Sequence, residues 1–193
     1  MAYQGNWRDI FQNWESLCLS YPLFLEHVVA KFLNTSTMDG YNPYRISDNG
    51  FDWEEIDADD PFSGIGYWGD HQIVYLLRLI EALRAHEPVV LNKWLDERIF
   101  VFANVPYRIK SLEAIFDNPK STIIFDSELS AKLRLQAKEK GSDSALLRST
   151  DASIHKANLT EKILIPMLVK LSNFVPGGGI WMNTERPEWN DAN

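Results

Sequence analysis

The chain has 193 residues, 45% of them hydrophobic, which suits one sizeable globular domain. Its 27 acidic and 19 basic residues give a net charge of −8, which argues against a nucleic-acid partner, because phosphate contacts need a basic patch. No apolar run could span a membrane and no export signal is visible, so we expect no membrane partner and a cytoplasmic location.

Residues 7–20 are predicted to form an amphipathic helix with an aromatic face. Its apolar residues recur at three- and four-residue spacing: Trp7, Ile10, Phe11, Trp14, Leu17, Cys18 and Tyr21. Cys18 is the only cysteine, and we expect it in the core. Pro22 interrupts the pattern, so a kink or a fresh helix start is expected there, with the second helix running to about Leu33.

Residues 41–67 are predicted to form a long irregular segment rich in aromatic and acidic side chains. Seven acids lie between Asp48 and Asp60 without a Lys or Arg among them. A long loop of this kind in a compact domain favours a functional role, and a solvated acidic turn is the alternative. The spacing and the glycine of a calcium-binding EF-hand are absent, so no metal site is expected here.

Asp70 leads a predicted helix that runs to about residue 84. Its apolar residues cover a wide arc, so we expect it to be buried on most sides: Ile73, Val74, Leu76, Leu77, Leu79, Ile80 and Leu83. A short helix over about 89–97 follows. The alternation in "RIFVFANVPYRI" then favours a strand, and "NPKSTIIFDSE" is compatible with a partner strand in a small hairpin.

The last third of the chain returns to helix. Residues 127–140 predict a charged helix, and Thr160 is interpreted as the N-cap of a helix over 161–174 that Pro166 should kink. There is no βαβ rhythm and no phosphate-binding glycine loop. The predicted fold is therefore mainly all-α, with helical hairpins, long loops and one small β-hairpin.

Three Trp-x-Asp triplets stand out, at residues 7–9, 68–70 and 189–191. The structural interpretation is that each Trp is core and each Asp favours a helix start. The functional interpretation is sugar binding, since carboxylates hydrogen-bond sugar hydroxyls and one carboxylic acid protonates the leaving oxygen in glycosidic cleavage. The four histidines are scattered and no nucleophile motif is present, so neither zinc nor acyl chemistry is expected.

The triplets and their neighbours resemble the catalytic domain of the cellobiose and chitobiose phosphorylases. Residues 8–13, "RDIFQN", are similar to that family's Arg-Asp-x-x-Gln-Asp helix start, and "WGDHQIVYLL" is a looser match to its Ser-Asp-Asp-x-x-Trp-Leu segment. "EWNDAN" is similar to its Gly-Asp-Trp-Asn-Asp-Gly motif. Asn13, Glu188 and Ala192 depart from the family pattern, and residues 98–155 have no counterpart in it.

The resemblance implies a partial (α/α)6 toroid with sugar-binding and catalytic residues around one mouth. Asp191 would be the general acid, and the implied substrate-binding residues are Arg8, Asp9, Gln12, Trp68, Asp70, Trp189 and Asn190. No metal or cofactor is implied, although inorganic phosphate would be the co-substrate of a phosphorylase. A six-hairpin toroid has more helices than this chain predicts. Residues 1–193 are therefore expected to be the N-terminal part of one incomplete domain, whose partner is the rest of its own chain.

The expected function is thus part of a carbohydrate-active enzyme that cleaves glycosidic bonds of a disaccharide or oligosaccharide with inversion, by phosphorolysis or hydrolysis. The alternatives are a carbohydrate-binding toroid without catalysis and an α-helical interaction module whose Trp residues are only core. We expect Asp9, Asp70 and Asp191 to lie near helix N-termini that open toward one concave face. We also expect the isolated chain to be unstable or oligomeric, with a large exposed apolar patch.

Overall fold

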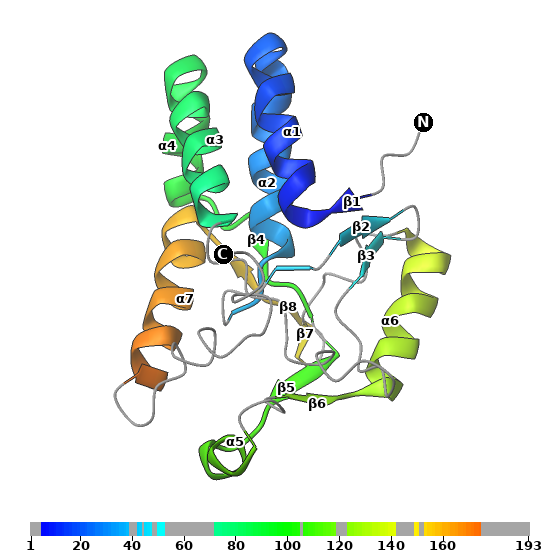
Figure 1. Cartoon of the computed structure of the whole chain (residues 1–193). Helices are drawn as coiled ribbons and strands as arrows, with labels where there is room; N and C mark the ends of the chain where they lie inside the picture. Colours follow the sequence, from blue (N-terminus) through cyan, green and yellow to red (C-terminus); the bar gives the residue numbers. More distant parts are fainter. Residues whose placement is uncertain are drawn as a thin grey trace, which may run out of the picture.

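The computed structural model describes residues 5–38, 42–43, 45–47, 50–52, 72–104, 106–118, 123–141, 149–150 and 153–174. Within these ranges the chain is mostly helical, with several short antiparallel strand pairs (Figure 1). The mainly helical fold class and the presence of a small β-hairpin are therefore confirmed.

Four helices form two neighbouring hairpins. The first consists of α1 (Trp7–Ser20), the short 3-10 helix η1 (Pro22–Phe24) and α2 (Leu25–Thr35), and the second of α3 (Gln72–His86) and α4 (Pro88–Asp96). Pro22 and Pro88 stand at the first turn of the element that each begins, where a missing N–H costs no hydrogen bond. The fresh helix start at Pro22 is thus confirmed. α3 packs against both α1 and α2, so the two hairpins lie side by side (Figure 1).

The core lies between these hairpins and is rich in aromatic rings. The ring centre of Trp7 is 4.5 Å from that of Phe11 and 5.3 Å from that of Phe32, and Phe11 and Phe32 are 4.8 Å apart in edge-on contact. Aromatic pairs in this range contribute beyond their buried area. Cys18 is also buried, as expected from its position on the apolar face of α1.

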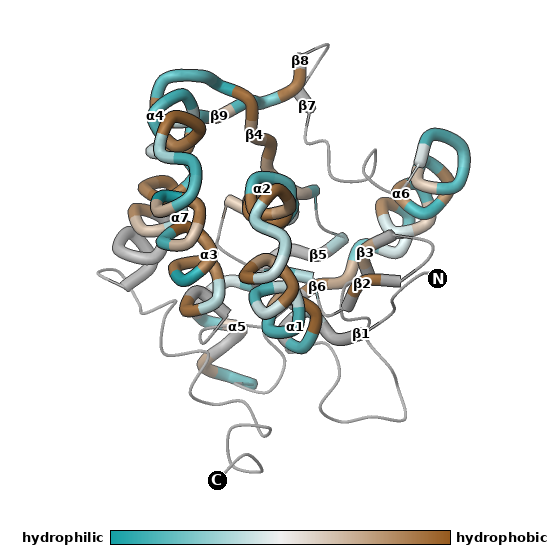
Figure 2. Tube along the Cα trace, turned by 90° about the horizontal axis from the view of Figure 1, so that it is seen from above, coloured by the Kyte–Doolittle hydropathy of each residue, from teal (hydrophilic) through white to brown (hydrophobic). Residues whose placement is uncertain are grey.

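Helix α3 differs from the expectation that it is buried on most sides. Leu76, Leu79 and Leu83 are buried, but the side chains of Val74 and Leu77 are 50% and 55% exposed. The prediction was wrong because a wide apolar arc says nothing about how much of it the neighbouring helices cover. Figure 2 shows α1 to α4 nearly end-on, each with hydrophobic and hydrophilic residues along it.

Short strands connect and flank the helices. β1 (Gly5–Asn6), β2 (Arg45–Ser47) and β3 (Gly50–Asp52) form one antiparallel sheet, in which Ile46 pairs with Phe51. These two side chains pack against the hydrophobic core. Residues 41–67 were expected to be irregular throughout, and β2 and β3 correct this. Strands of three residues are too short to produce a recognisable alternation in the sequence.

The strand expected within residues 98–109 is two strands with different partners. β4 (Phe100–Val101) pairs with β9 (Lys156–Ala157), and β5 (Tyr107–Ile109) pairs with β6 (Ile123–Phe125). The second pair is the predicted hairpin. A further pair joins β7 (Ser149–Thr150) to β8 (Ser153–Ile154). The alternation of apolar residues predicted the extended backbone of β4. It could not predict the partner strand, which lies more than fifty residues away in the sequence.

Three more helices complete the described chain: α5 (Leu112–Asp117), α6 (Ser127–Lys140) and α7 (Leu159–Phe174). The predicted charged helix over 127–140 is confirmed, and Figure 2 shows it as largely hydrophilic. It is followed by Gly141 at a φ of +94°, a conformation that favours glycine. Pro166 lies inside α7.

The N-cap of α7 is Asn158 and not Thr160. The side-chain oxygen of Asn158 accepts a 2.8 Å hydrogen bond from the backbone N–H of Glu161, and the Glu161 carboxylate accepts a 3.0 Å bond from the backbone N–H of Asn158. This reciprocal pair is a capping box. Thr160 is already the second residue of the helix. Asn158 was missed because Asn and Thr are both good N-cap residues. The feature that distinguishes them is the Glu three residues later, which only Asn158 has in Glu161.

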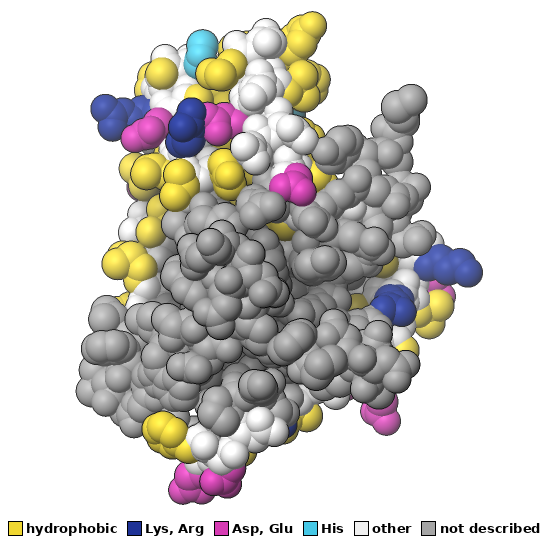
Figure 3. All heavy atoms as spheres, in the orientation of Figure 1, with side chains coloured by type: hydrophobic (Ala, Val, Ile, Leu, Met, Phe, Trp, Pro, Cys, Tyr) yellow, Lys and Arg dark blue, Asp and Glu magenta, His cyan; other side chains and the backbone are white. Residues whose placement is uncertain are grey.

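Large apolar side chains remain exposed on several helices. On α7 the side chains of Met167 and Leu168 are 54% and 61% exposed, and Leu19 on α1 is 65% exposed. Figure 3 shows hydrophobic side chains at the surface over the helical hairpins, with charged residues between them. Among the described helices, none has both the length and the hydropathy that a membrane crossing requires.

Candidate functional site

The first Trp-x-Asp triplet divides its residues between the two sides of α1. Trp7 is completely buried, together with Ile10 and Phe11, whereas Asp9 is half-buried and Gln12 is exposed. This follows from the helical period, which turns residues 9 and 12 away from residues 7, 10 and 11. Of the two described side chains in this triplet, Trp7 is therefore a core residue and Asp9 is the one placed to meet a ligand.

Asp9 lies in the first turn of α1, as predicted. A carboxylate in this position is stabilised by the unpaired backbone N–H groups and the dipole of the helix. Arg8 is the second residue of the same helix, and its side chain lies outside the described part of the structure. The other predicted site residues, Trp68, Asp70, Trp189, Asn190 and the general acid Asp191, also lie outside the described residues. The expected grouping of three carboxylates at one mouth stays a prediction.

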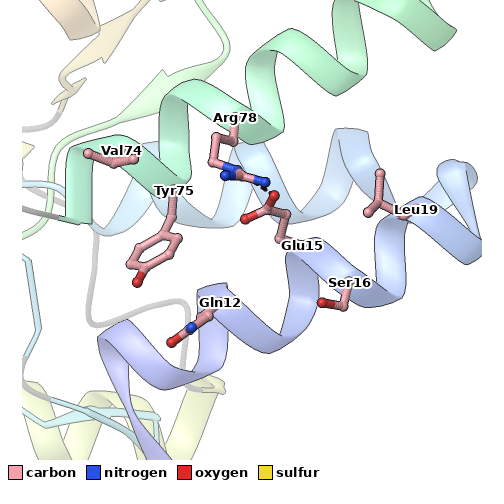
Figure 4. A pocket seen from close by; sticks show the side chains of 7 residues that line it. All are labelled: Gln12, Glu15, Ser16, Leu19, Val74, Tyr75 and Arg78. Atoms are coloured by element: carbon pink, nitrogen blue, oxygen red, sulfur yellow. Dashed lines mark hydrogen bonds and ion pairs between the residues drawn. The ribbon is translucent and has the colours of Figure 1, made fainter.

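Gln12 is one of the residues that line a groove between α1 and α3 (Figure 4). The groove has a volume of about 540 Å³ and is lined by Gln12, Glu15, Ser16, Leu19, Val74, Tyr75 and Arg78. A smaller hollow of about 290 Å³ shares Glu15, Leu19 and Arg78 with it and extends toward Leu25, Leu79, Glu81 and Ala82. The two hollows meet at the residues that they share.

An ion pair crosses the groove. Nε of Arg78 lies 2.5 Å from Oε1 of Glu15, and Figure 4 shows the two side chains meeting between the helices. The Glu15 side chain is only 15% exposed, while that of Arg78 is 60% exposed. A pair that is this open to water adds little to stability, typically less than about 1 kcal/mol. Its charges nevertheless lie beside the half-buried ring of Tyr75, in a concave surface.

Of the groove residues, sequence reasoning identified Gln12 and missed Glu15, Tyr75 and Arg78. A signal was present on α1, because residues 12, 15, 16 and 19 follow the three- and four-residue spacing of one helix face. On α3 the signal was the pair Tyr75 and Arg78, which interrupts an otherwise apolar run. The tertiary contact between α1 and α3 is what brings these two faces together.

Lys162 forms a second polar cluster, which is closed to solvent. The side chain is 3% exposed, and its ammonium group donates hydrogen bonds to the carbonyl oxygens of Ser36 at 3.1 Å and Val101 at 2.8 Å. It also lies 3.8 Å from the centre of the Phe102 ring. Burial lowers the pKa of Lys162 to about 7. This cluster joins α7 to the end of α2 and to β4, and its burial leaves no room for a ligand.

Metal chemistry finds no support in the described residues. They contain no group of three His, Cys, Asp or Glu side chains that could hold a metal ion. His27, His86 and His155 are exposed, each on a different element or connection, and Cys18 is buried. The expectation of no metal site stays a prediction.

The α1 start and the α1–α3 groove are therefore two accessible polar features of the described helical hairpins that a ligand could use. Together they supply a carboxylate, an amide, a charged pair and an aromatic ring, a set suited to an uncharged polar ligand. No protein-family model matches the sequence, and the search of curated proteins found no match either.

Proposed function

We propose that the chain is part of a carbohydrate-active (α/α) toroid that cleaves glycosidic bonds with inversion, by phosphorolysis or hydrolysis. The observation that carries the proposal is the way α1 presents its motif. Trp7 and Phe11 anchor the helix in the core, while Asp9 and Gln12 are turned away from that core. The sequence resemblance assigns sugar binding to these same two residues.

The helical architecture is compatible with this proposal. Toroids of this class are built from successive helical hairpins, and α1–α2 and α3–α4 are two such hairpins packed against each other. In the proposed reaction Asp191 protonates the leaving glycosidic oxygen. Water or phosphate then attacks the opposite face of the sugar, and for water a second carboxylate acts as base at a distance of about 6.5–9.5 Å. Asp9 accepts hydrogen bonds from sugar hydroxyls, and the amide of Gln12 both accepts and donates them.

A second candidate is sugar binding without cleavage, and the α1–α3 groove favours it. The groove offers hydrogen-bonding groups and a ring without requiring any residue of the 189–191 triplet. The burial of Trp7 is equally compatible with the third alternative, an α-helical interaction module, because such a module needs its Trp residues only for packing.

The test is a turnover and binding assay of the full-length protein over a panel of disaccharides, with and without inorganic phosphate. We expect at least one disaccharide to be cleaved, and proton NMR of the fresh product should show the inverted anomer. Asp9→Asn should weaken binding and turnover together, whereas Asp96→Asn, at the exposed last residue of α4, should change neither. Binding without cleavage would select the second candidate. A retained anomer, or no binding of any sugar, would refute the proposal.

A further inference from the structure

The groove between α1 and α3 is a feature that no motif in the sequence assigns to a role. Gln12, Val74 and Tyr75 lie in segments that resemble the phosphorylases, but of the groove residues the resemblance assigns a role to Gln12 alone. Figure 4 shows Tyr75 and Arg78 reaching from α3 toward α1, and Glu15 and Leu19 reaching from α1 toward α3. Its volume of about 540 Å³ lies within the range of roughly 300–1,000 Å³ that small-molecule sites occupy.

We propose that this groove binds one uncharged sugar ring, with the Glu15–Arg78 pair hydrogen-bonding adjacent hydroxyls and Tyr75 packing on the apolar face of the ring. The choice of a sugar rests on the proposed function. The choice of this place rests on the side chains that meet here.

The ion pair supplies both kinds of hydrogen-bonding group. Arg78 uses Nε to bond Oε1 of Glu15, and a guanidinium has four further N–H donors. A carboxylate accepts through two oxygens, so Glu15 also has acceptor capacity beyond this bond. Each hydroxyl of a sugar can donate and accept a hydrogen bond. Two neighbouring hydroxyls can therefore bond the Arg78 donor and the Glu15 acceptor, which lie side by side. Charge-assisted bonds of this kind are stronger than neutral ones, and more so once the ligand excludes water.

The remaining lining explains why the ligand is a ring without a charge. Glu15 and Arg78 carry opposite charges, and no other Asp, Glu, Lys, Arg or His is among the residues that line the groove, so the lining has no net charge to attract an ion. The Tyr75 ring is half-buried and Val74 beside it is 50% exposed, which gives a partly apolar wall. A sugar ring has hydroxyls at its edge and C–H groups on its face, and it fits such a surface.

The experiment is a calorimetric titration with methyl glycosides of glucose, galactose and mannose, and with glucosamine and glucuronate as charged probes. At least one methyl glycoside should bind, and the charged sugars should bind more weakly. Arg78→Gln and Tyr75→Ala should each weaken that binding at least tenfold. The matched control is Arg84→Gln, an exposed arginine at the other end of α3, which should leave it unchanged. Thermal melts of all variants check that they are folded.

The outcomes separate this inference from the proposed function. Sugar binding or cleavage that Arg78→Gln and Tyr75→Ala leave unaltered would overturn the groove assignment and leave the enzyme proposal standing. Binding that these variants weaken, in a chain that cleaves no disaccharide, would support the groove and refute cleavage. Tighter binding of a charged sugar, or no binding of any sugar, would overturn the inference.

Discussion

The ammonium nitrogen of Lys162 lies 2.8 Å from the carbonyl oxygen of Val101, although sixty-one residues separate them in the chain. The same nitrogen bonds the carbonyl oxygen of Ser36, the C-cap residue of α2. A cation at the end of a helix is favoured by the unpaired carbonyl groups there. One side chain thus fastens the first turn of α7 to α2 and β4.

This burial should make stability depend on pH. The pKa of Lys162 is about 7 when folded and near its ordinary value of 10.5 when unfolded. Between these values the unfolded chain binds more protons, so the free energy of unfolding should rise with pH, by at most about 1.4 kcal/mol per pH unit. Urea unfolding of wild type and Lys162→Met from pH 7 to 10 would measure the difference. Lys93→Met, at an exposed position, is the control, and parallel curves for wild type and Lys162→Met would refute the prediction.

Asn158→Ala should destabilise the protein by about 1 kcal/mol, because it removes the acceptor for the Glu161 backbone N–H. Thr160→Ala should have a much smaller effect, since Thr160 is exposed and lies inside the helix. Thermal melts of the two variants make a matched pair. An equal loss of stability in the two variants would contradict the assignment of Asn158 as the N-cap.

Trp7→Ala should cost about 3–5 kcal/mol, because it leaves a cavity among Phe11, Phe32 and Phe51. Trp7→Phe should cost less, since it keeps an aromatic ring and Nε1 of Trp7 has no hydrogen-bond acceptor among the described residues. Trp14→Ala, at a half-buried position, is the control. Urea unfolding followed by circular dichroism would rank the three, and the prediction fails if Trp14→Ala is the most damaging.

Cys18 should react slowly with thiol reagents in the folded protein. Its side chain is 1% exposed, and burial raises the pKa of its thiol above the ordinary value, so little reactive thiolate is present near neutral pH. Absorbance assays with an aromatic disulfide, with and without urea, would compare the folded and unfolded rates. Similar rates in the two conditions would mean that the contact between the hairpins opens readily.

Asp191→Asn should reduce turnover of any cleaved disaccharide by about 10²–10⁴-fold, because an amide has no proton to give to the leaving oxygen. Sugar affinity should stay close to that of wild type, since the shape of the side chain is kept. Single-turnover rates and a binding titration on the same variant would separate the two effects. Full activity of the Asp191→Asn variant would show that Asp191 is not the general acid.

Local sequence determined much of the secondary structure. The period of Trp7, Ile10 and Phe11 predicted both helix α1 and its buried face, and Pro22 marked the start of the next element. The charged run that became α6 and the hairpin of β5 with β6 were also predictable. In each case the signal lies within one element or between near neighbours, where the helical or strand period dictates which side chains share a face.

Tertiary structure decided what lies between elements. α3 carries apolar residues on most sides, and only the positions of α1 and α2 determine that Leu79 is buried and Leu77 exposed. The groove exists because Arg78 meets Glu15 across sixty-three residues of chain. Lys162 sits in a sequence that predicts an ordinary helical lysine, and its burial depends on carbonyl groups supplied by α2 and β4. Long-range packing selects these partners, and no local period encodes it.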